Sequence, residues 1–243
     1  MRRVCISLLA TLLILGGVVF VQQREEIQNT QEDVPKSYVN TYLTTCAACH
    51  GERGEGNRET MAPAIAALPR WYIQQQIWSI HSGRRGTHPM DVTGAGMRTV
   101  LMSLDPEEID EAVDYLMALP VPEVVHEIEG DLERGASLYK EHCMICHRFN
   151  GHGEQAFLSA PLTGLQDWYL YEQMKKFQNG SRGYHPDDEL GAKMKQAASQ
   201  LESDQDLRDI ISYISTLSNN YPIKKSDSTV MSVDPDEAGD PTR

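Results

Sequence analysis

The chain has 243 residues, of which five are cysteines and ten are methionines, and its formal net charge is −13. So acidic a balance excludes nucleic acid and anionic lipid as the main binding partners, because like charges repel, and it favours docking to a basic patch on another protein. The length is enough for one or two domains.

The N-terminus carries an apolar segment. Two arginines precede residues 4–21, and all but two side chains in this run are apolar. The run is near the minimum length for a membrane-spanning helix, and no Ala-x-Ala cleavage site of a secretory signal is present. Residues 1–24 are therefore predicted to be an uncleaved signal anchor, with the rest of the chain on the periplasmic side of a bacterial inner membrane. The alternative is a cleaved signal peptide and a soluble periplasmic protein.

A polar stretch, residues 25–37, is predicted to be a tether. It leads to the first of two copies of the pattern Cys-x-x-Cys-His, at residues 46–50 and 143–147, which lie 97 residues apart. Two thiols three residues apart share one side of a helical turn, where both can add to the vinyl groups of one porphyrin. A single copy would fit a redox dithiol or half of a zinc site equally well. Two copies inside a longer repeat favour two covalently attached c-type haems.

Each predicted haem is attached through two cysteines, and its iron is bound by the adjacent histidine: Cys46, Cys49 and His50 in the first half, and Cys143, Cys146 and His147 in the second. The repeat also indicates which residue is the second ligand of each iron. When the first half is shifted by 97 residues, only one pair of methionines coincides, Met97 and Met194. A thioether is the soft ligand expected of a high-potential electron-transfer haem, so this pair is predicted to bind the irons.

Histidines offer the alternative second ligand. Besides the histidines of the two patterns, only His88 and His185 coincide under the same shift. If they do not bind iron, each is a loop histidine that bonds to the backbone or to a haem propionate. A repeated arginine, Arg85 and Arg182, is either a clamp for the haem carboxylates or a solvated loop residue.

The apolar pattern predicts helices and no strands. A helix runs into each Cys-x-x-Cys-His pattern, and a second begins near Trp71 and Trp168. The last helix is framed by residues 105–119 in the first half and by residues 203–217 in the second. Residues 120–130, which contain two prolines and an acidic stretch, are predicted to be a linker. Residues 219–243 are polar and are predicted to be a disordered tail.

With these features, each half resembles a class I cytochrome c, and the pair is similar to the dihaem periplasmic cytochromes of the c-four type. The resemblance covers about residues 38–218. It implies an all-α fold of two tandem cytochrome c domains, residues 38–119 and 131–218, each wrapped around one covalently bound haem, after an N-terminal hydrophobic helix. It also implies histidine and methionine as axial ligands and electron transfer as the whole function.

Two features of the family fit this chain less closely. The family places a glycine where the first helix crosses the aromatic residue of the last, and Gly135 fits this in the second half, whereas the first half has Tyr38. The family also uses a proline carbonyl to orient the ligating histidine, a contact that fixes the tautomer. Pro63 and Pro161 are the candidates, although they are one residue out of register.

The predicted function is electron transfer and not catalysis, because an iron with both axial positions filled has no open site for chemistry. The partners would be a quinol-oxidising complex or a dehydrogenase as donor and a terminal oxidase or reductase as acceptor. The protein would act as a tethered carrier or as a subunit of such a complex. The main alternative is a dihaem peroxidase with one open haem, which the symmetric pair Met97 and Met194 disfavours. A haem-based sensor is a more distant alternative, because no output domain is visible.

Overall fold

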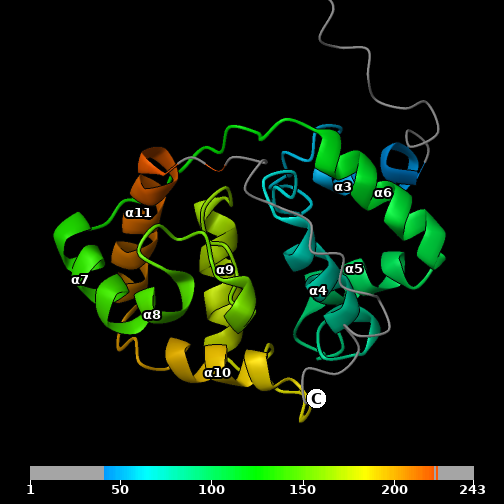
Figure 1. Ribbon diagram of the computed structural model, residues 1–243. Helices are drawn as coiled ribbons and strands as arrows, with labels where there is room; N and C mark the ends of the chain where they lie inside the picture. The colour runs from blue at the N-terminus through cyan, green and yellow to red at the C-terminus, as the bar shows by residue number, and fades with distance from the viewer. Residues whose placement is uncertain (1–40, 222, 224–243) are drawn as a thin grey trace, which may run out of the picture. The chain divides into compact units, whose positions relative to one another are not determined.

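The computed structural model describes residues 41–221 and 223, and this part of the chain is helical (Figure 1). The first half contains the π-helix η1 (Tyr42–Cys46), α3 (Ala47–His50), α4 (Arg70–His81), α5 (Val92–Leu101) and α6 (Pro106–Ala118). The second half contains α7 (Leu132–His142), α8 (Met144–His147), the 3-10 helix η2 (Gln155–Phe157), α9 (Asp167–Gln178), α10 (Glu189–Ala198) and α11 (Asp204–Asn220). Extended pairing within these residues is limited to two isolated bridges, Asn57 with Ala62 and Glu154 with Ser159. The prediction of a helical fold without a sheet is confirmed for them.

Several predicted segments lie outside the described residues. They are the N-terminal anchor at residues 1–24, the tether at residues 25–37, Tyr38, and residues 224–243 of the tail. Among the helices that the structure does describe, none has both the length and the apolar character needed to cross a membrane.

The last helix of each half begins where the sequence predicts. Asp105 caps α6 and Ser203 caps α11, and each forms a reciprocal capping box with the side chain three residues later. Pro106 occupies the first position of α6, where its missing N–H costs no intrahelical bond. These caps fix the start of each helix and therefore the direction of its apolar face.

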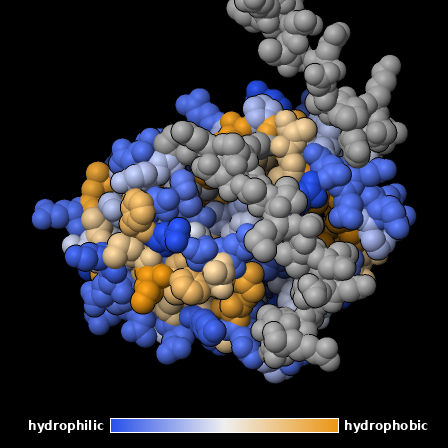
Figure 2. Space-filling model, in the orientation of Figure 1, coloured by the Kyte–Doolittle hydropathy of each residue, from blue (hydrophilic) through white to orange (hydrophobic). Residues whose placement is uncertain are grey.

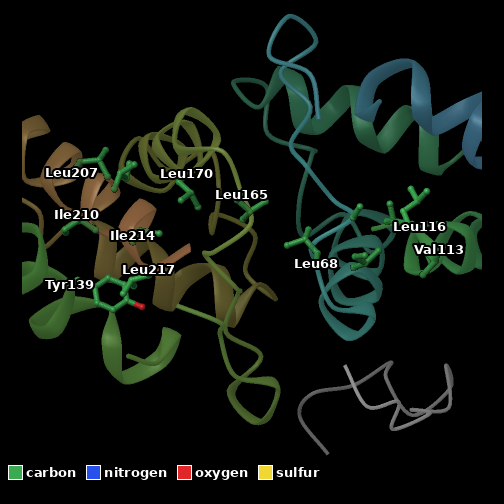
Figure 3. Close-up of a cluster of buried hydrophobic side chains, with 14 of the residues drawn as sticks. Leu68, Val113, Leu116, Tyr139, Leu165, Leu170, Leu207, Ile210, Ile214 and Leu217 are labelled. Atoms are coloured by element: carbon green, nitrogen blue, oxygen red, sulfur yellow. The ribbon is translucent and has the colours of Figure 1, made fainter. Parts of the chain in front are cut away.

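The core of the second half forms where α11 packs against α7 and α9. Apolar side chains recur at helical spacing along α11, and Figure 3 shows them in one cluster with Tyr139 and Leu170: Leu207, Ile210, Ile214 and Leu217. In the first half, the buried apolar side chains include Val113 and Leu116 of α6 together with Leu68. Complete burial of a side chain of this size contributes about 1.5–3 kcal/mol, so the last helix of each half is the main apolar support for the segments that precede it.

The predicted linker, residues 120–130, contains no helix or strand. The second half holds its end: the buried carboxylate of Asp167 accepts hydrogen bonds from the backbone N–H groups of Glu127 and Ile128. Directly after the linker, the backbone N–H of Asp131 donates to the side chain of Asp209 in α11 at 2.9 Å. The segment is therefore fixed to the second half before α7 begins.

Gly135 permits the close crossing of α7 and α11. A Cβ at this position would lie 2.0 Å from the carbonyl oxygen of Asp209 and 3.0 Å from the Cβ of Tyr213. Beside the crossing, the rings of Tyr139 and Tyr213 pack with their centroids 5.5 Å apart. The predicted role of this glycine is confirmed in the second half.

Replacing Gly135 by alanine is expected to lower the free energy of unfolding by about 1–3 kcal/mol, because the added methyl group must displace the backbone of α11. Thermal unfolding of the haem-loaded protein measures the change. Gly96→Ala on α5 is the control, since a Cβ there meets nothing within 4 Å. Helix propensity predicts that this control is neutral or gains up to about 1 kcal/mol. Equal midpoints for the two variants would contradict the close crossing.

Candidate functional sites

Both Cys-x-x-Cys-His patterns end in a short helical turn, as their spacing predicts. Residues 47–50 form α3 and residues 144–147 form α8. In each pattern the first cysteine is half-buried and the second is exposed. The two thiols of a turn therefore lie between the protein interior and the surface.

The half-buried thiols are poorly suited to the redox chemistry of a reactive dithiol. Burial, and next the charge of the neighbouring cysteine, raises the pKa of Cys46 to about 11 and that of Cys143 to about 12. A reactive dithiol needs the opposite, a pKa held low by nearby positive charge. Over residues 41–221, no three side chains of His, Cys, Asp and Glu gather as they would around a metal ion. Covalent attachment of a cofactor remains the interpretation that fits both patterns.

The histidine of each pattern is buried and is oriented by one hydrogen bond. Nδ1 of His50 lies 2.9 Å from the carbonyl oxygen of Pro63, and Nδ1 of His147 lies 2.7 Å from that of Ala160. A carbonyl oxygen only accepts, so the proton must be on Nδ1, and the lone pair of Nε2 is free to bind a metal. Burial lowers the pKa of both imidazoles, which keeps them neutral near pH 7.

The prediction that Pro161 orients the second histidine is wrong, whereas Pro63 does contact the first. The acceptor carbonyl belongs to Ala160, which lies 97 residues after Pro63. The carbonyl therefore keeps the register of the repeat, while the proline ring has moved one position along the chain. Because the hydrogen bond uses only a backbone oxygen, the position of the backbone matters and the identity of the side chain does not.

Met97 and Met194 lie on helices that the apolar pattern of the sequence did not predict. Met97 is in α5 and Met194 is in α10, and both side chains are half-buried. Asp91 and Asp188 cap these helices, because each carboxylate accepts the backbone N–H three residues later. The two methionines thus occupy equivalent positions on equivalent, capped helices.

The geometry of His88 and His185 differs from that of an iron ligand. Nδ1 of His88 accepts the backbone N–H of Met90 at 3.1 Å, and Nδ1 of His185 accepts that of Asp187 at 3.2 Å. An imidazole whose Nδ1 accepts carries its proton on Nε2, so neither nitrogen has a lone pair left for iron. This contact is the one expected of a loop histidine that bonds to the backbone.

The two halves touch through residues that are equivalent in the repeat. Thr87 and Tyr184, which are 97 residues apart, join their hydroxyl groups in a hydrogen bond. Gln166 adds two contacts: its amide donates to the carbonyl oxygen of Glu55 at 2.7 Å and accepts from the backbone N–H of Ala64 at 2.8 Å. A contact centred on the same position of two repeats is approximately two-fold symmetric.

Arg85 and Arg182 lie at this contact, so the interpretation as solvated loop residues does not hold. Arg85 donates to the hydroxyl of Tyr169 at 3.1 Å and to the side chain of Gln173 at 3.3 Å, and Arg182 donates to Gln173 at 2.9 Å. Burial, and next the charge of Arg85, lowers the pKa of Arg182 to about 10. Nε of Arg85 is buried without a hydrogen-bond partner among the described residues. The pair of guanidinium groups can therefore accommodate an additional anionic acceptor.

One ion pair breaks the symmetry of the contact. Nζ of Lys176 lies 2.5 Å from Oδ1 of Asp91, and their side chains are only 13% and 1% exposed. The equivalent residues are Ser79 and Asp188, so the pair has no second copy. Burial alone would raise the pKa of Asp91, but the hydrogen bond and charge of Lys176 hold it below its ordinary value of 3.8. Sequence reasoning missed Lys176, since a residue without a repeat partner gives no signal under the shift.

Replacing Lys176 by methionine is expected to lower the free energy of unfolding by about 3–5 kcal/mol, because Asp91 is left buried without its partner. Lys175→Met is the matched control: its pair with Asp204 is 3.5 Å long and half-exposed, and such pairs contribute no more than about 1 kcal/mol. Denaturant titration measures both variants.

The loss of unfolding free energy caused by Lys176→Met is expected to depend on pH. The folded-state pKa of Asp91 is depressed, so its stabilisation is fully present above the unfolded value of 3.8 and is lost as the pH falls through the lower folded value. The difference between the wild type and Lys176→Met should therefore shrink in acid. A difference that stays constant from neutral pH to below the folded pKa would contradict the pairing.

The two buried, neutral imidazoles, each on a turn with two thiols, are features of a c-type electron-transfer protein with two haems. The chain belongs to the cytochrome c family, because the family model for cytochrome c matches residues 39–120 and 132–218. It therefore carries two covalently attached c-type haems with iron, and its function is electron transfer.

Similar proteins include the thiosulfate dehydrogenase electron acceptor of Stutzerimonas stutzeri (strain A1501), 26% identical over 189 residues, which cover 73% of this chain and 84% of that protein. The crystal structure of reduced cytochrome c4 from Pseudomonas stutzeri has the same fold, with a TM-score of 0.56, 22% identity, and coverage of 74% of this chain and 97% of that chain. Thiosulfate dehydrogenase from Marichromatium purpuratum matches with a TM-score of 0.55 and 26% identity over 70% of this chain. The match covers 36% of that longer chain.

Proposed function

We propose that the protein carries electrons between two redox proteins through two haems whose irons are six-coordinate. Each half supplies two cysteines for attachment, one histidine and one methionine: Cys46, Cys49, His50 and Met97, then Cys143, Cys146, His147 and Met194. When bound, each haem supplies an iron that gains and releases one electron. The observation that carries the proposal is the pair of buried imidazoles with a free Nε2 lone pair.

In this proposal, the residues of each half bind one haem and orient its iron ligands. The carbonyl oxygens of Pro63 and Ala160 fix the histidine rings and raise their basicity as ligands. Met97 and Met194 would supply the second ligand of each iron, which would leave no open position for a substrate. This symmetry supports a carrier that is not an enzyme, and it counts against a dihaem peroxidase, in which one haem would have an open position.

Arg85 and Arg182 support the same assignment. Two guanidinium groups lie close together between the halves, and within the described residues neither bonds to a carboxylate. The carboxylate of Asp91, which lies near them, is bonded to Lys176. Nε of Arg85 is buried without a hydrogen-bond partner among the described residues, and a haem carboxylate is a suitable acceptor for its N–H.

The donor that we propose is a dehydrogenase, with a quinol-oxidising complex as the alternative, and the acceptor is a terminal oxidase or reductase. A dehydrogenase is supported by the name of the relative from Stutzerimonas stutzeri, an electron acceptor of thiosulfate dehydrogenase. The match to part of a longer thiosulfate dehydrogenase favours a permanent subunit as the second form of the same function. The site of action is the periplasmic side of the inner membrane, with residues 4–21 as the anchor or as part of a cleaved signal.

A mass measurement and an optical redox titration of the exported protein test the proposal. The expected mass includes two tetrapyrroles, and the expected spectra show two low-spin centres that do not bind carbon monoxide. A mass with one tetrapyrrole or none would contradict the two attachment sites. A high-spin fraction that reacts with peroxide would support the peroxidase instead.

A further inference from the structure

The surroundings of the two Cys-x-x-Cys-His turns differ in charge, although the turns themselves are alike. We call residues 48–60, beside the first turn, the first rim and residues 145–157 the second rim. The first rim contains five charged side chains: Glu52, Arg53, Glu55, Arg58 and Glu59. The equivalent residues of the second rim carry no formal charge: Phe149, Asn150, His152, Gln155 and Ala156.

The second rim exposes large apolar side chains instead. Ile145 is 82% exposed, Phe149 is 60% exposed and Phe157 is 63% exposed, and their first-rim equivalents are Ala48, Glu52 and Thr60. Single exposed apolar residues are ordinary, but a group around one functional turn marks an interaction surface. Figure 2 shows apolar surface, in orange, over the part of the molecule where Figure 1 places α8.

Ser159, two residues beyond the second rim, links the rim to the exposed cysteine, because its hydroxyl also accepts the backbone N–H of Glu154. Ser159 donates to the carbonyl oxygen of Cys146, so the segment that carries Phe157 lies against α8. In the first half, the hydroxyl of Thr60 itself donates to the carbonyl oxygen of Cys49 at 3.0 Å, which places the equivalent position beside the motif.

We expect Ile145 to remain exposed when a haem is attached. It lies two positions after the first cysteine of its pattern, and residues two apart do not share a face of a helical turn. Its side chain is therefore directed away from the side on which Cys143 and Cys146 hold the porphyrin. The ring of Phe149 packs against the ring of Tyr221 in a T-shaped arrangement, with the centroids 5.6 Å apart.

The charges that the second rim does contain cancel each other. Arg148 and Glu154 form an ion pair with 2.7 Å between Nη2 and Oε2. The rim as a whole is therefore nearly neutral, in a chain whose net charge is −13. A charged partner face would lose hydration there without gaining an opposite charge, whereas an apolar, uncharged face would gain from burial.

We propose that the second rim is the docking surface for a redox protein whose own contact face is apolar and uncharged, and that electrons pass to or from this partner through the second half. The proposal rests on the electron-transfer function proposed above. It assigns the two halves different neighbours: the second half meets its partner by apolar contact, and the charged first rim does not take part in that contact.

The test measures the rate of electron transfer between the haem-loaded protein and a small blue-copper protein with an apolar, uncharged face over its copper. The wild-type rate should change less than about twofold between roughly 0.01 M and roughly 1 M ionic strength, although the screening length falls from roughly 30 Å to roughly 3 Å. Phe157→Glu should lower the rate about tenfold, because a charge then has to be buried on docking. Arg53→Glu, the control in the first rim, alters the charge of a side chain that is 76% exposed, and it should change the rate less than about twofold.

A second variant, Phe157→Thr, and a small reductant, ascorbate, distinguish failure of the docking surface from failure of the proposed function. Phe157→Thr reproduces the first-rim residue and should lower the rate in the same direction but by less. Equal losses in Phe157→Glu and Arg53→Glu, or a wild-type rate that falls steeply with salt, would overturn the docking surface. If ascorbate reduces both irons and Phe157→Glu keeps the wild-type rate, only the docking surface is wrong. If ascorbate reduces neither iron, the proposed function fails, and this inference fails with it.

Discussion

Replacing Met97 by alanine is expected to open the first iron to added ligands and to leave the second unchanged, and Met194→Ala should do the reverse. Loss of the thioether should also lower the potential of that iron by a substantial part of the roughly 0.8 V over which axial ligands set haem potentials. Carbon monoxide binding and a potentiometric titration measure the two effects. Each variant should show one altered centre out of two.

Matched controls for this prediction come from the same segment of the chain. Met90 is 61% exposed and has no methionine at its repeat equivalent, so Met90→Ala should bind no carbon monoxide. His88→Ala and His185→Ala should leave ligation intact, because the Nδ1 of each ring accepts a backbone N–H. If His88→Ala opened an iron and Met97→Ala did not, the ligand assignment would have to be reversed.

Replacing Cys143 and Cys146 together by serine is expected to leave one haem per chain where the wild type has two. The second half should then unfold at a much lower temperature, since so small a unit depends on the buried cofactor for its core. Mass spectrometry gives the haem count, and circular dichroism during heating gives the unfolding. Cys5→Ser, which changes the one cysteine outside both patterns, should keep both haems. Two haems retained in the double variant would contradict the attachment site.

The repeat made much of the fold and site predictable. A shift of 97 residues pairs the histidines, the methionines and the arginines, and the structure places the histidines and methionines on equivalent helices and the arginines in equivalent loops. Local chemistry fixed the start of the last helices, because Asp105 and Ser203 satisfy backbone N–H groups that no earlier residue can reach. A capping interaction spans only a few residues, so it can be recognised in the sequence without knowledge of the tertiary structure.

What the sequence did not reveal has physical reasons. Helices α5 and α10 were missed because glycine near the start of each hides the helical pattern, although Asp91 and Asp188 stand as caps. The shift from Pro161 to Ala160 was missed because a backbone carbonyl leaves no trace in the sequence. The Lys176–Asp91 pair joins residues 85 positions apart, and no periodicity records such a contact.

The hydrogen bond between Thr87 and Tyr184 has a consequence for the ancestry of the chain. Because the same position of both repeats meets at this point, a single ancestral unit could have used that face to associate with itself as a homodimer. Duplication and fusion of its gene would keep this geometry and free each copy to change alone. Lys176 and Phe157 differ from their repeat equivalents, Ser79 and Thr60. Fusion thus allows a polarity between donor and acceptor ends that two identical subunits, encoded by one gene, could never acquire.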